Sequence, residues 1–160
     1  MKIFLTVGTQ LPFPRLIKHF EQLALSNSSL IINAQISDDT QSYSGLNTYR
    51  YLSDLDYLSF FSGADLVVSH AGMGTVIQSL ETCMPLIVVP RDHNLGEHRN
   101  SHQTDTARWF EADKICPVVW DLNSLTLEYL HEVMSSHTKT KHSSGSLDDL
   151  IDSIHLEISR

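Results

Sequence analysis

The chain has 160 residues and a formal net charge of −8 at pH 7, with 41% hydrophobic and 19% charged residues. This length suits one compact domain, and no apolar run approaches the roughly 20 residues that cross a bilayer. The negative charge argues against nonspecific binding to duplex nucleic acid, which requires many basic contacts to phosphates. Composition therefore favours a soluble globular domain whose partners do not include nucleic acid.

Two further features bear on the cellular compartment. The N-terminus carries one lysine and a short apolar stretch before Gly8, too short for the hydrophobic region of a secretory signal. Cys83 and Cys116 lie far apart in the sequence and form no CxxC pair. Widely spaced cysteines without a disulfide framework are typical of a reducing compartment, so we expect a cytoplasmic protein.

The first half of the chain alternates apolar runs with apolar residues at helical spacing. A continuous apolar run at residues 2–7 ends at a glycine and predicts a buried strand, and the spacing over 14–25 predicts a helix. Further strands are expected at 30–34 and 48–52, on either side of a polar loop over 37–47. Ser53 is the expected cap of a second helix, which Gly63 closes.

The centre of the chain predicts a βαβ unit. Residues 65–70 form an apolar strand, 71–74 a glycine-rich turn, 75–83 a helix and 85–90 the next strand. The glycines thus stand where the strand passes into the helix.

The C-terminal part continues with a polar loop over 92–101, a helix over 102–112, a strand over 115–120 and a helix over 124–134. We expect one domain over 1–136, a flexible linker over 137–146 and an amphipathic helix within 147–160. Five or six strands alternating with helices predict a Rossmann-like, doubly wound parallel α/β sheet. Ligands of such sheets bind at the carboxyl ends of the strands.

The first candidate site is His70-Ala71-Gly72-Met73-Gly74-Thr75. A helix that starts after two glycines exposes free N–H groups and the positive end of its dipole, so this turn is a candidate cradle for a diphosphate. The motif is neither GxGxxG nor a Walker A loop. The alternative is a tight turn that needs positive φ, with Thr75 serving only as the helix N-cap.

The second candidate site is the loop over 91–103, which holds three histidines and two arginines in an acidic protein. Arginine favours bidentate contact with phosphate or carboxylate. A solvated polar loop is the alternative. His98 and His102 are four residues apart and could share a helix face, but the string EHRNSH is not HExxH, so we expect no metal site. A third, weaker element is the turn Gly8-Thr9-Gln10 after the first strand.

Four segments together, at residues 5–13, 64–75, 85–91 and 95–103, resemble the C-terminal domain of family 28 glycosyltransferases. The resemblance covers about residues 1–135. It is closer to the stand-alone donor-binding subunits of split transferases, namely the eukaryotic cytosolic subunit that makes dolichyl-diphosphate chitobiose and bacterial exopolysaccharide or capsule subunits. The string GEHRN-x-HQ points to the bacterial group.

The resemblance implies the C-terminal half of a GT-B enzyme that holds a UDP-sugar as substrate, without a cofactor. Gln103 matches the glutamine that reads the donor sugar, Gln78 stands where two-domain relatives carry a glutamate that bonds the ribose, and Thr106 stands where they carry an asparagine. The donor-binding residues that we expect are Gly8, Thr9, Gln10, His70, Gly72, Met73, Gly74, Thr75, Gln78, Arg91, Arg99, Asn100 and Gln103.

The expected reaction is an inverting, metal-independent transfer. Helix amides with Arg91 or Arg99 would stabilise the leaving UDP, and Glu97 or His98, or a residue of a partner, would be the base. The implied partner is a membrane-anchored subunit that holds a polyprenyl-diphosphate-linked acceptor at the inner face of the membrane. The amphipathic helix would dock on that partner or return to its own sheet.

Other functions compete with this reading. A non-catalytic interaction subunit remains open because Gln78 replaces the glutamate. A nucleotide-sugar epimerase needs both GT-B halves in one chain, which the length opposes. The donor sugar stays open among GlcNAc, Gal and GlcA.

Overall fold

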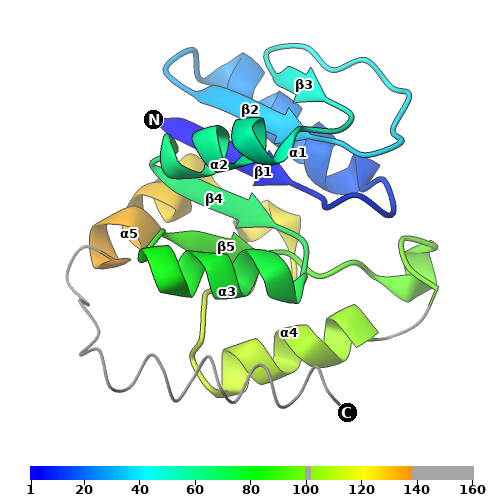
Figure 1. The fold of residues 1–160 in the computed structure, drawn as a ribbon, viewed down its shortest axis with the longest axis vertical. Helices are drawn as coiled ribbons and strands as arrows, with labels where there is room; N and C mark the ends of the chain where they lie inside the picture. The colour runs from blue at the N-terminus through cyan, green and yellow to red at the C-terminus, as the bar shows by residue number, and fades with distance from the viewer. Residues whose placement is uncertain (100–101, 138–160) are drawn as a thin grey trace.

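The computed structural model describes residues 1–99 and 102–137. Its centre is a parallel sheet of five strands in the order β3-β2-β1-β4-β5 (Figure 1). The strands span Lys2–Thr6 (β1), Ile31–Gln35 (β2), Asn47–Tyr49 (β3), Leu66–Ser69 (β4) and Leu86–Val88 (β5). The helices span Pro14–Ser26 (α1), Asp54–Ser62 (α2), Met73–Thr82 (α3), His102–Ala112 (α4) and Leu127–His137 (α5).

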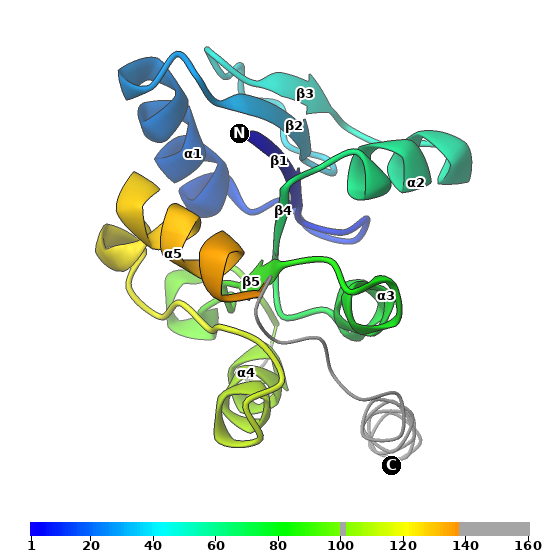
Figure 2. The same cartoon turned by 90° about the vertical axis from the view of Figure 1, so that its left-hand side faces the viewer.

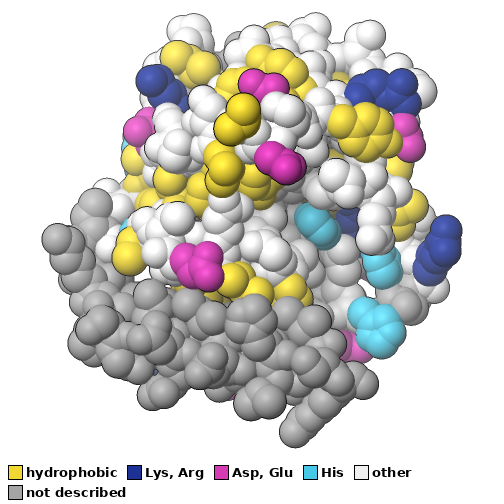
Figure 3. All heavy atoms as spheres, viewed as in Figure 1, with side chains coloured by type: hydrophobic (Ala, Val, Ile, Leu, Met, Phe, Trp, Pro, Cys, Tyr) yellow, Lys and Arg dark blue, Asp and Glu magenta, His cyan; other side chains and the backbone are white. Residues whose placement is uncertain are grey.

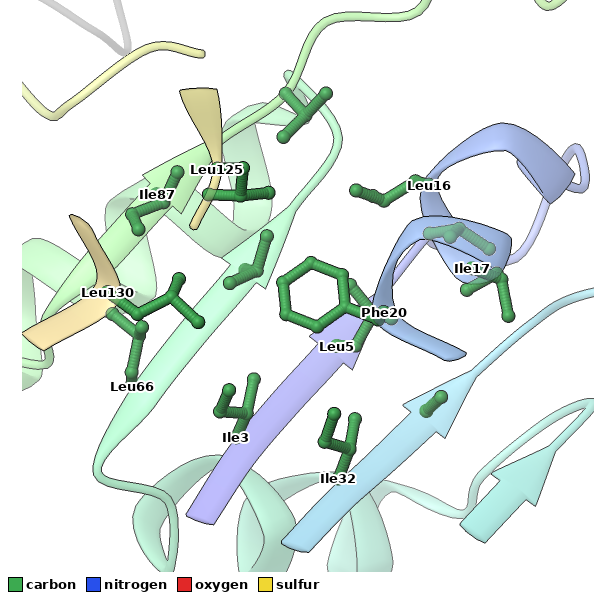
Figure 4. Packing of buried hydrophobic residues seen from close by; sticks show 14 of the residues in the cluster. Ile3, Leu5, Leu16, Ile17, Phe20, Ile32, Leu66, Ile87, Leu125 and Leu130 are labelled. Carbon is green, nitrogen blue, oxygen red and sulfur yellow. The ribbon is translucent and has the colours of Figure 1, made fainter. Parts of the chain in front are cut away.

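Helices cover both faces of the sheet, as the doubly wound prediction requires. Figure 2 shows α1 and α5 on one face and α2 and α3 on the other. Because successive side chains of a strand point to opposite faces, β1 sends Ile3 and Leu5 to one core cluster and Phe4 to the other. Phe20 of α1 packs on the first face (Figure 4). The predicted Rossmann-like fold is thus confirmed.

The predicted strand over 115–120 is wrong. In this segment only Val118 pairs with β5, through an isolated parallel bridge to Val88. Pro117 has no N–H to donate, so the pairing reduces to two bonds: the Val88 N–H donates to Pro117 O at 2.9 Å and the Val119 N–H to Val88 O at 2.8 Å.

The last predicted helix starts later than expected. A short 3₁₀ turn over Leu122–Ser124 comes first, and the Tyr129 N–H then donates to Thr126 Oγ1 at 3.3 Å, so Thr126 caps α5. The helix continues to His137, the first residue of the predicted linker. The rest of that linker and the predicted helix within 147–160 lie outside the described residues. None of the helices described is long and apolar enough to span a bilayer.

Parallel strands bring the loops that follow them to one edge of the sheet. The segments after β1, β4 and β5 therefore meet there, although they are far apart in the sequence. These are the three loops that the sequence analysis selected.

Candidate functional site

The amino end of α3 is an uncapped helix terminus. Gly72 is its N-cap residue, and no side chain of the described part of the chain caps the helix. The backbone N–H groups of Met73, Gly74 and Thr75 have no partner among residues 1–99 and 102–137. The alternative in which Thr75 serves only as the N-cap is wrong, since Thr75 occupies the third helical position. Free amides at the positive end of a helix form a site for an anion.

Space for such an anion exists at Gly74. A Cβ added at this glycine would meet no atom of the described residues within 4 Å. Its φ is not in the left-handed region, so the turn does not need glycine here for conformational reasons. The missing side chain instead leaves the backbone accessible.

His70 occupies a slot between two other glycines. A Cβ at Gly8 would lie 2.8 Å from His70 Cε1, and one at Gly72 would lie 2.5 Å from His70 Nε2. Gly8 also has φ of +74°, which L side chains rarely adopt. Both glycines therefore make room for the imidazole ring, a requirement that the sequence analysis did not detect.

The environment keeps this imidazole neutral. Burial lowers the pKa of His70 to about 4, and the nearby positive charge of Arg91 acts in the same direction. Its buried Nδ1 has no hydrogen-bond partner among the described residues. At neutral pH the ring is a polar group and not a cation.

These elements surround one pocket of about 280 Å³. The loop after β1, the turn after β4, the loop after β5 and the start of α4 all contribute to it. Figure 3 shows histidine side chains gathered on the side of the molecule where the loops after β4 and β5 lie. The lining residues are Val7, Gly8, Thr9, Gln10, Leu11, His70, Gly72, Gly74, Thr75, Arg91, His98 and Gln103.

Arg91 lines the pocket but its guanidinium is used by the fold. The residue is 2% exposed. Its Nη1 donates to Pro12 O at 2.7 Å, and its Nη2 donates to Val7 O at 2.8 Å and to Leu11 O. The cation lies 5.1 Å from the centre of the Phe13 ring. Burial lowers its pKa to about 10, so it stays charged at pH 7. Arg91 therefore fastens the loop after β1 and adds positive potential to the pocket.

The structure does not bring Glu97 into the pocket. Its carboxylate accepts from Arg15 Nε at 2.7 Å and Nη2 at 2.9 Å, and from the Asp92 N–H at 2.9 Å. The side chain is only 10% exposed. This bidentate pair joins α1 to the loop after β5, a role that the sequence analysis missed.

The other predicted residues divide between the pocket and its surroundings. His98 and Gln103 line it, and the Arg91 N–H donates to Gln103 Oε1 at 3.2 Å. Gln78 lies one helical turn beyond it, and Arg99 is exposed outside it. Also outside its lining is Met73, although this residue starts α3. Asn100 falls outside the described residues.

The idea that His98 and His102 share a helix face is wrong, because α4 begins at His102. In the described part of the chain no group of three or more His, Cys, Asp or Glu residues is placed to hold a metal ion. A further polar neighbour of the pocket is Tyr57 of α2, whose hydroxyl lies 3.4 Å from Thr75 Oγ1.

The glycosyltransferase family 28 C-terminal domain matches residues 3–146. Among relatives, the UDP-N-acetylglucosamine transferase subunit ALG13 of Debaryomyces hansenii is 31% identical over 83 residues, 52% of this chain and 39% of that protein. The Mus musculus protein of the same name is 40% identical over 60 residues, 38% of this chain and 5% of that protein. The chain thus spans well under half the length of these relatives.

Solved structures share the fold. The glycotransferase of kitacinnamycin superposes with a TM-score of 0.60 at 16% identity, over 98% of this chain and 40% of that one. MurG of Acinetobacter baumannii superposes with a TM-score of 0.54 at 18% identity, over 95% of this chain and 49% of that one. The fold is therefore that of one half of a GT-B glycosyltransferase. With the family match over nearly its whole length, the chain belongs to the glycosyltransferase family 28 C-terminal domain family.

Proposed function

We propose that this protein is the donor-binding subunit of a split glycosyltransferase, and that it holds the diphosphate of a UDP-sugar at the amino end of α3. One observation carries the proposal. The amides of Met73, Gly74 and Thr75 are unpaired in the described structure and open onto a pocket where nothing stands within 4 Å of a Cβ at Gly74. A helix terminus of this kind suits a diphosphate.

The same groups would act during transfer. Breaking the bond between sugar and diphosphate develops negative charge on the leaving UDP, and fixed N–H dipoles stabilise that charge without reorganising. The charged Arg91, held by the carbonyl groups of Val7, Leu11 and Pro12, supports them through its field. His70, which is neutral at pH 7, adds a polar group to the pocket and no further positive charge.

Inverting transfer also needs a base for the acceptor hydroxyl. Of the two candidates in this chain, only His98 lines the pocket, whereas the Glu97 carboxylate is engaged by Arg15. We favour His98 or a residue of a partner subunit. A partner is expected because the relatives of this chain are named as subunits of a transferase.

The proposed partner is a membrane-anchored subunit that presents a polyprenyl-diphosphate-linked saccharide at the cytoplasmic face of the membrane, in exopolysaccharide or capsule synthesis. The relatives named as UDP-N-acetylglucosamine transferase subunits support a subunit role and make UDP-GlcNAc the first donor to test. UDP-Gal and UDP-GlcA are the other donors.

Isothermal titration calorimetry with UDP and the three UDP-sugars tests the proposal. Gly74→Val is expected to lower UDP affinity by at least about 100-fold, since its side chain would fill the approach to the amides. Glu81→Val places the same side chain on an exposed position of α3 outside the pocket, and is expected to bind UDP normally. Equal UDP affinity of Gly74→Val and wild type would overturn the placement.

The second candidate is a non-catalytic interaction subunit with the same fold. Gln78 favours it for two reasons. A neutral amide bonds a ribose hydroxyl more weakly than a carboxylate does. Gln78 also lies outside the pocket lining. Transfer assays with the partner and labelled UDP-sugars separate the two. Donor binding without transfer in every pairing would favour the non-catalytic subunit.

A further inference from the structure

An ion pair connects the two loops that form opposite parts of the pocket wall. Arg15 is the second residue of α1 and follows the loop after β1, whereas Glu97 belongs to the loop after β5. Both side chains are partly buried, and neither lines the pocket. The Glu97 carboxylate accepts from Arg15 Nε and Nη2, and Nη2 also donates to Pro90 O at 3.3 Å. The pair therefore joins the pocket walls without facing the pocket.

A second set of contacts joins the same loops beside this pair. The ring of the buried Phe13 lies within cation–π distance of two guanidinium groups, with its centre 5.2 Å from the guanidinium carbon of Arg15 and 5.1 Å from that of Arg91. Arg91 Nη1 donates to Pro12 O at 2.7 Å and to Glu97 O at 3.4 Å. Glu97 is thus held through its carboxylate and also through its carbonyl oxygen.

Glu97 also closes the start of its own loop. Its Oε2 accepts from the Asp92 N–H at 2.9 Å, and its N–H donates to Asp92 O at 3.2 Å. Between these two residues lies the 3₁₀ turn His93–Leu95, followed by Gly96 with φ of +71°. Residues 92–97 therefore form a closed turn, and the last residue of this turn is fixed to α1.

His98 directly follows this fixed residue. It lines the pocket, and it is near enough to His70 for its charge to lower the pKa of that imidazole. Because consecutive Cα atoms are only about 3.8 Å apart, fixing residue 97 limits the positions that the side chain of residue 98 can reach. The contacts of Glu97 therefore determine where His98 lies relative to the pocket.

We propose that Glu97 is a positioning residue, which acts with Arg15 to hold His98 at the pocket. The inference rests on the proposed function, in which the pocket binds a UDP-sugar and His98 is this chain's candidate base. Glu97 needs no contact with the substrate in this role. A base that is displaced by about 1 Å from its productive position can lose on the order of 100-fold in rate, so the fixing of residue 97 matters for transfer.

Modification of histidines by diethyl pyrocarbonate tests the placement in the full-length chain, with each residue followed by mass spectrometry. In the wild type, saturating UDP is expected to slow the modification of His98 at least about fivefold, because the ligand shares the pocket with this ring. In Glu97→Ala and in Arg15→Ala, the protection is expected to fall below about twofold. His93 is exposed and outside the pocket lining, so UDP is expected to leave its rate unchanged in every variant.

Three further variants separate positioning from stability. Glu97→Gln keeps one acceptor oxygen and is expected to give intermediate protection. Arg15→Ala/Glu97→Ala is expected to lose no more protection than either single variant, because the pair acts as one unit. Asp38→Ala breaks an exposed ion pair with Arg50 outside the pocket and is expected to keep the protection of the wild type. A pair that served stability alone would lower the free energy of unfolding and leave the protection unchanged.

Calorimetry with UDP on the same proteins distinguishes failure of the proposed function from failure of this inference. A wild type that does not bind UDP would overturn the proposed function. If UDP binds and protects His98 equally in the wild type and in the alanine variants, the donor site stands and the positioning role is wrong. Bound UDP that gives no protection of His98 in the wild type would also overturn the positioning role. Should Glu97→Ala not fold, Arg15→Ala and Glu97→Gln supply the same comparison.

Discussion

The loops after β4 and β5 reach the same edge of the sheet, but they differ in what they leave available. After β4, the turn at Gly72 opens α3 with amides that have no partner among the described residues, and these residues leave open space at Gly74. After β5, Arg91 and Glu97 carry full charges, yet these charges are engaged by backbone carbonyls and by Arg15. A charged side chain is therefore a weaker pointer to a ligand than a backbone group without a partner.

The difference has a physical basis. Burying a charge is costly unless the fold supplies partners, so a buried arginine or glutamate is usually paired within the protein. The start of a helix always leaves amides that the helix itself cannot satisfy. When no side chain caps these amides, they are available to donate to water or to a ligand.

The largest expected effect concerns Arg91. Arg91→Met is expected to lower the free energy of unfolding by about 3–5 kcal/mol, because it removes the donors of several buried carbonyl groups. The exposed Arg99 supplies the matched control, and Arg99→Met is expected to change stability by less than about 0.5 kcal/mol. Urea unfolding measures both. Equal, small losses would mean that Arg91 is free for ligand and that the two loops do not differ.

The second effect is a dependence of stability on pH. The folded-state pKa of His70 is lowered to about 4 from 6.5, so the unfolded chain binds the proton first as pH falls. The contribution to stability is complete above pH 6.5 and is lost as pH falls toward 4, by at most about 3 kcal/mol. His70→Gln removes this part of the pH dependence, which urea unfolding between pH 4 and 7 detects. If the free energy of unfolding falls equally with pH in wild type and in His70→Gln, the imidazole is not held neutral and enclosed.

The third test compares the same substitution at two neighbouring glycines. Gly72→Ala is expected to destabilise by about 1–3 kcal/mol, since its Cβ meets the His70 ring. Gly74→Ala has open space in a helix and is expected to stabilise by about 0.5–1 kcal/mol. Thermal unfolding shows whether each substitution lowers or raises the stability of the protein. If His70→Ala does not restore stability to Gly72→Ala, the clash is elsewhere.

The smallest effect concerns donor affinity at Arg99. This arginine is exposed and outside the pocket lining, so Arg99→Ala is expected to weaken UDP binding by no more than about fivefold. The difference is expected to vanish at about 1 M salt, where charges are screened within about 3 Å. A larger, salt-independent loss in calorimetry would place Arg99 in direct contact with the donor.

Most of the fold could be predicted because strands buried on both faces appear as continuous apolar runs, as in residues 2–7 and 65–70. The absence of a strand over 115–120 could not be predicted, because this segment has the same apolar pattern as the buried strands. A single proline, Pro117, reduces its pairing to one bridge at Val118. Local pattern does not show how many ladder bonds a strand end will make.

The candidate site was predictable only where its features depend on local sequence. The turn after β4 was found because glycines at a strand-to-helix junction have a local physical meaning. The roles of Arg91 and Glu97 were not, because their partners are remote: Arg15 precedes Glu97 by 82 residues and Val7 precedes Arg91 by 84. Spacing along the chain carries no information on such pairs.

The imidazole slot places unequal demands on its two glycines. At position 72 the backbone is one that any residue adopts, with φ of −100°, so only the volume of the ring excludes a side chain. At position 8 the left-handed backbone excludes one independently of the ring. In a related sequence with a small residue in place of His70, position 72 would accept a side chain, whereas position 8 would still require glycine.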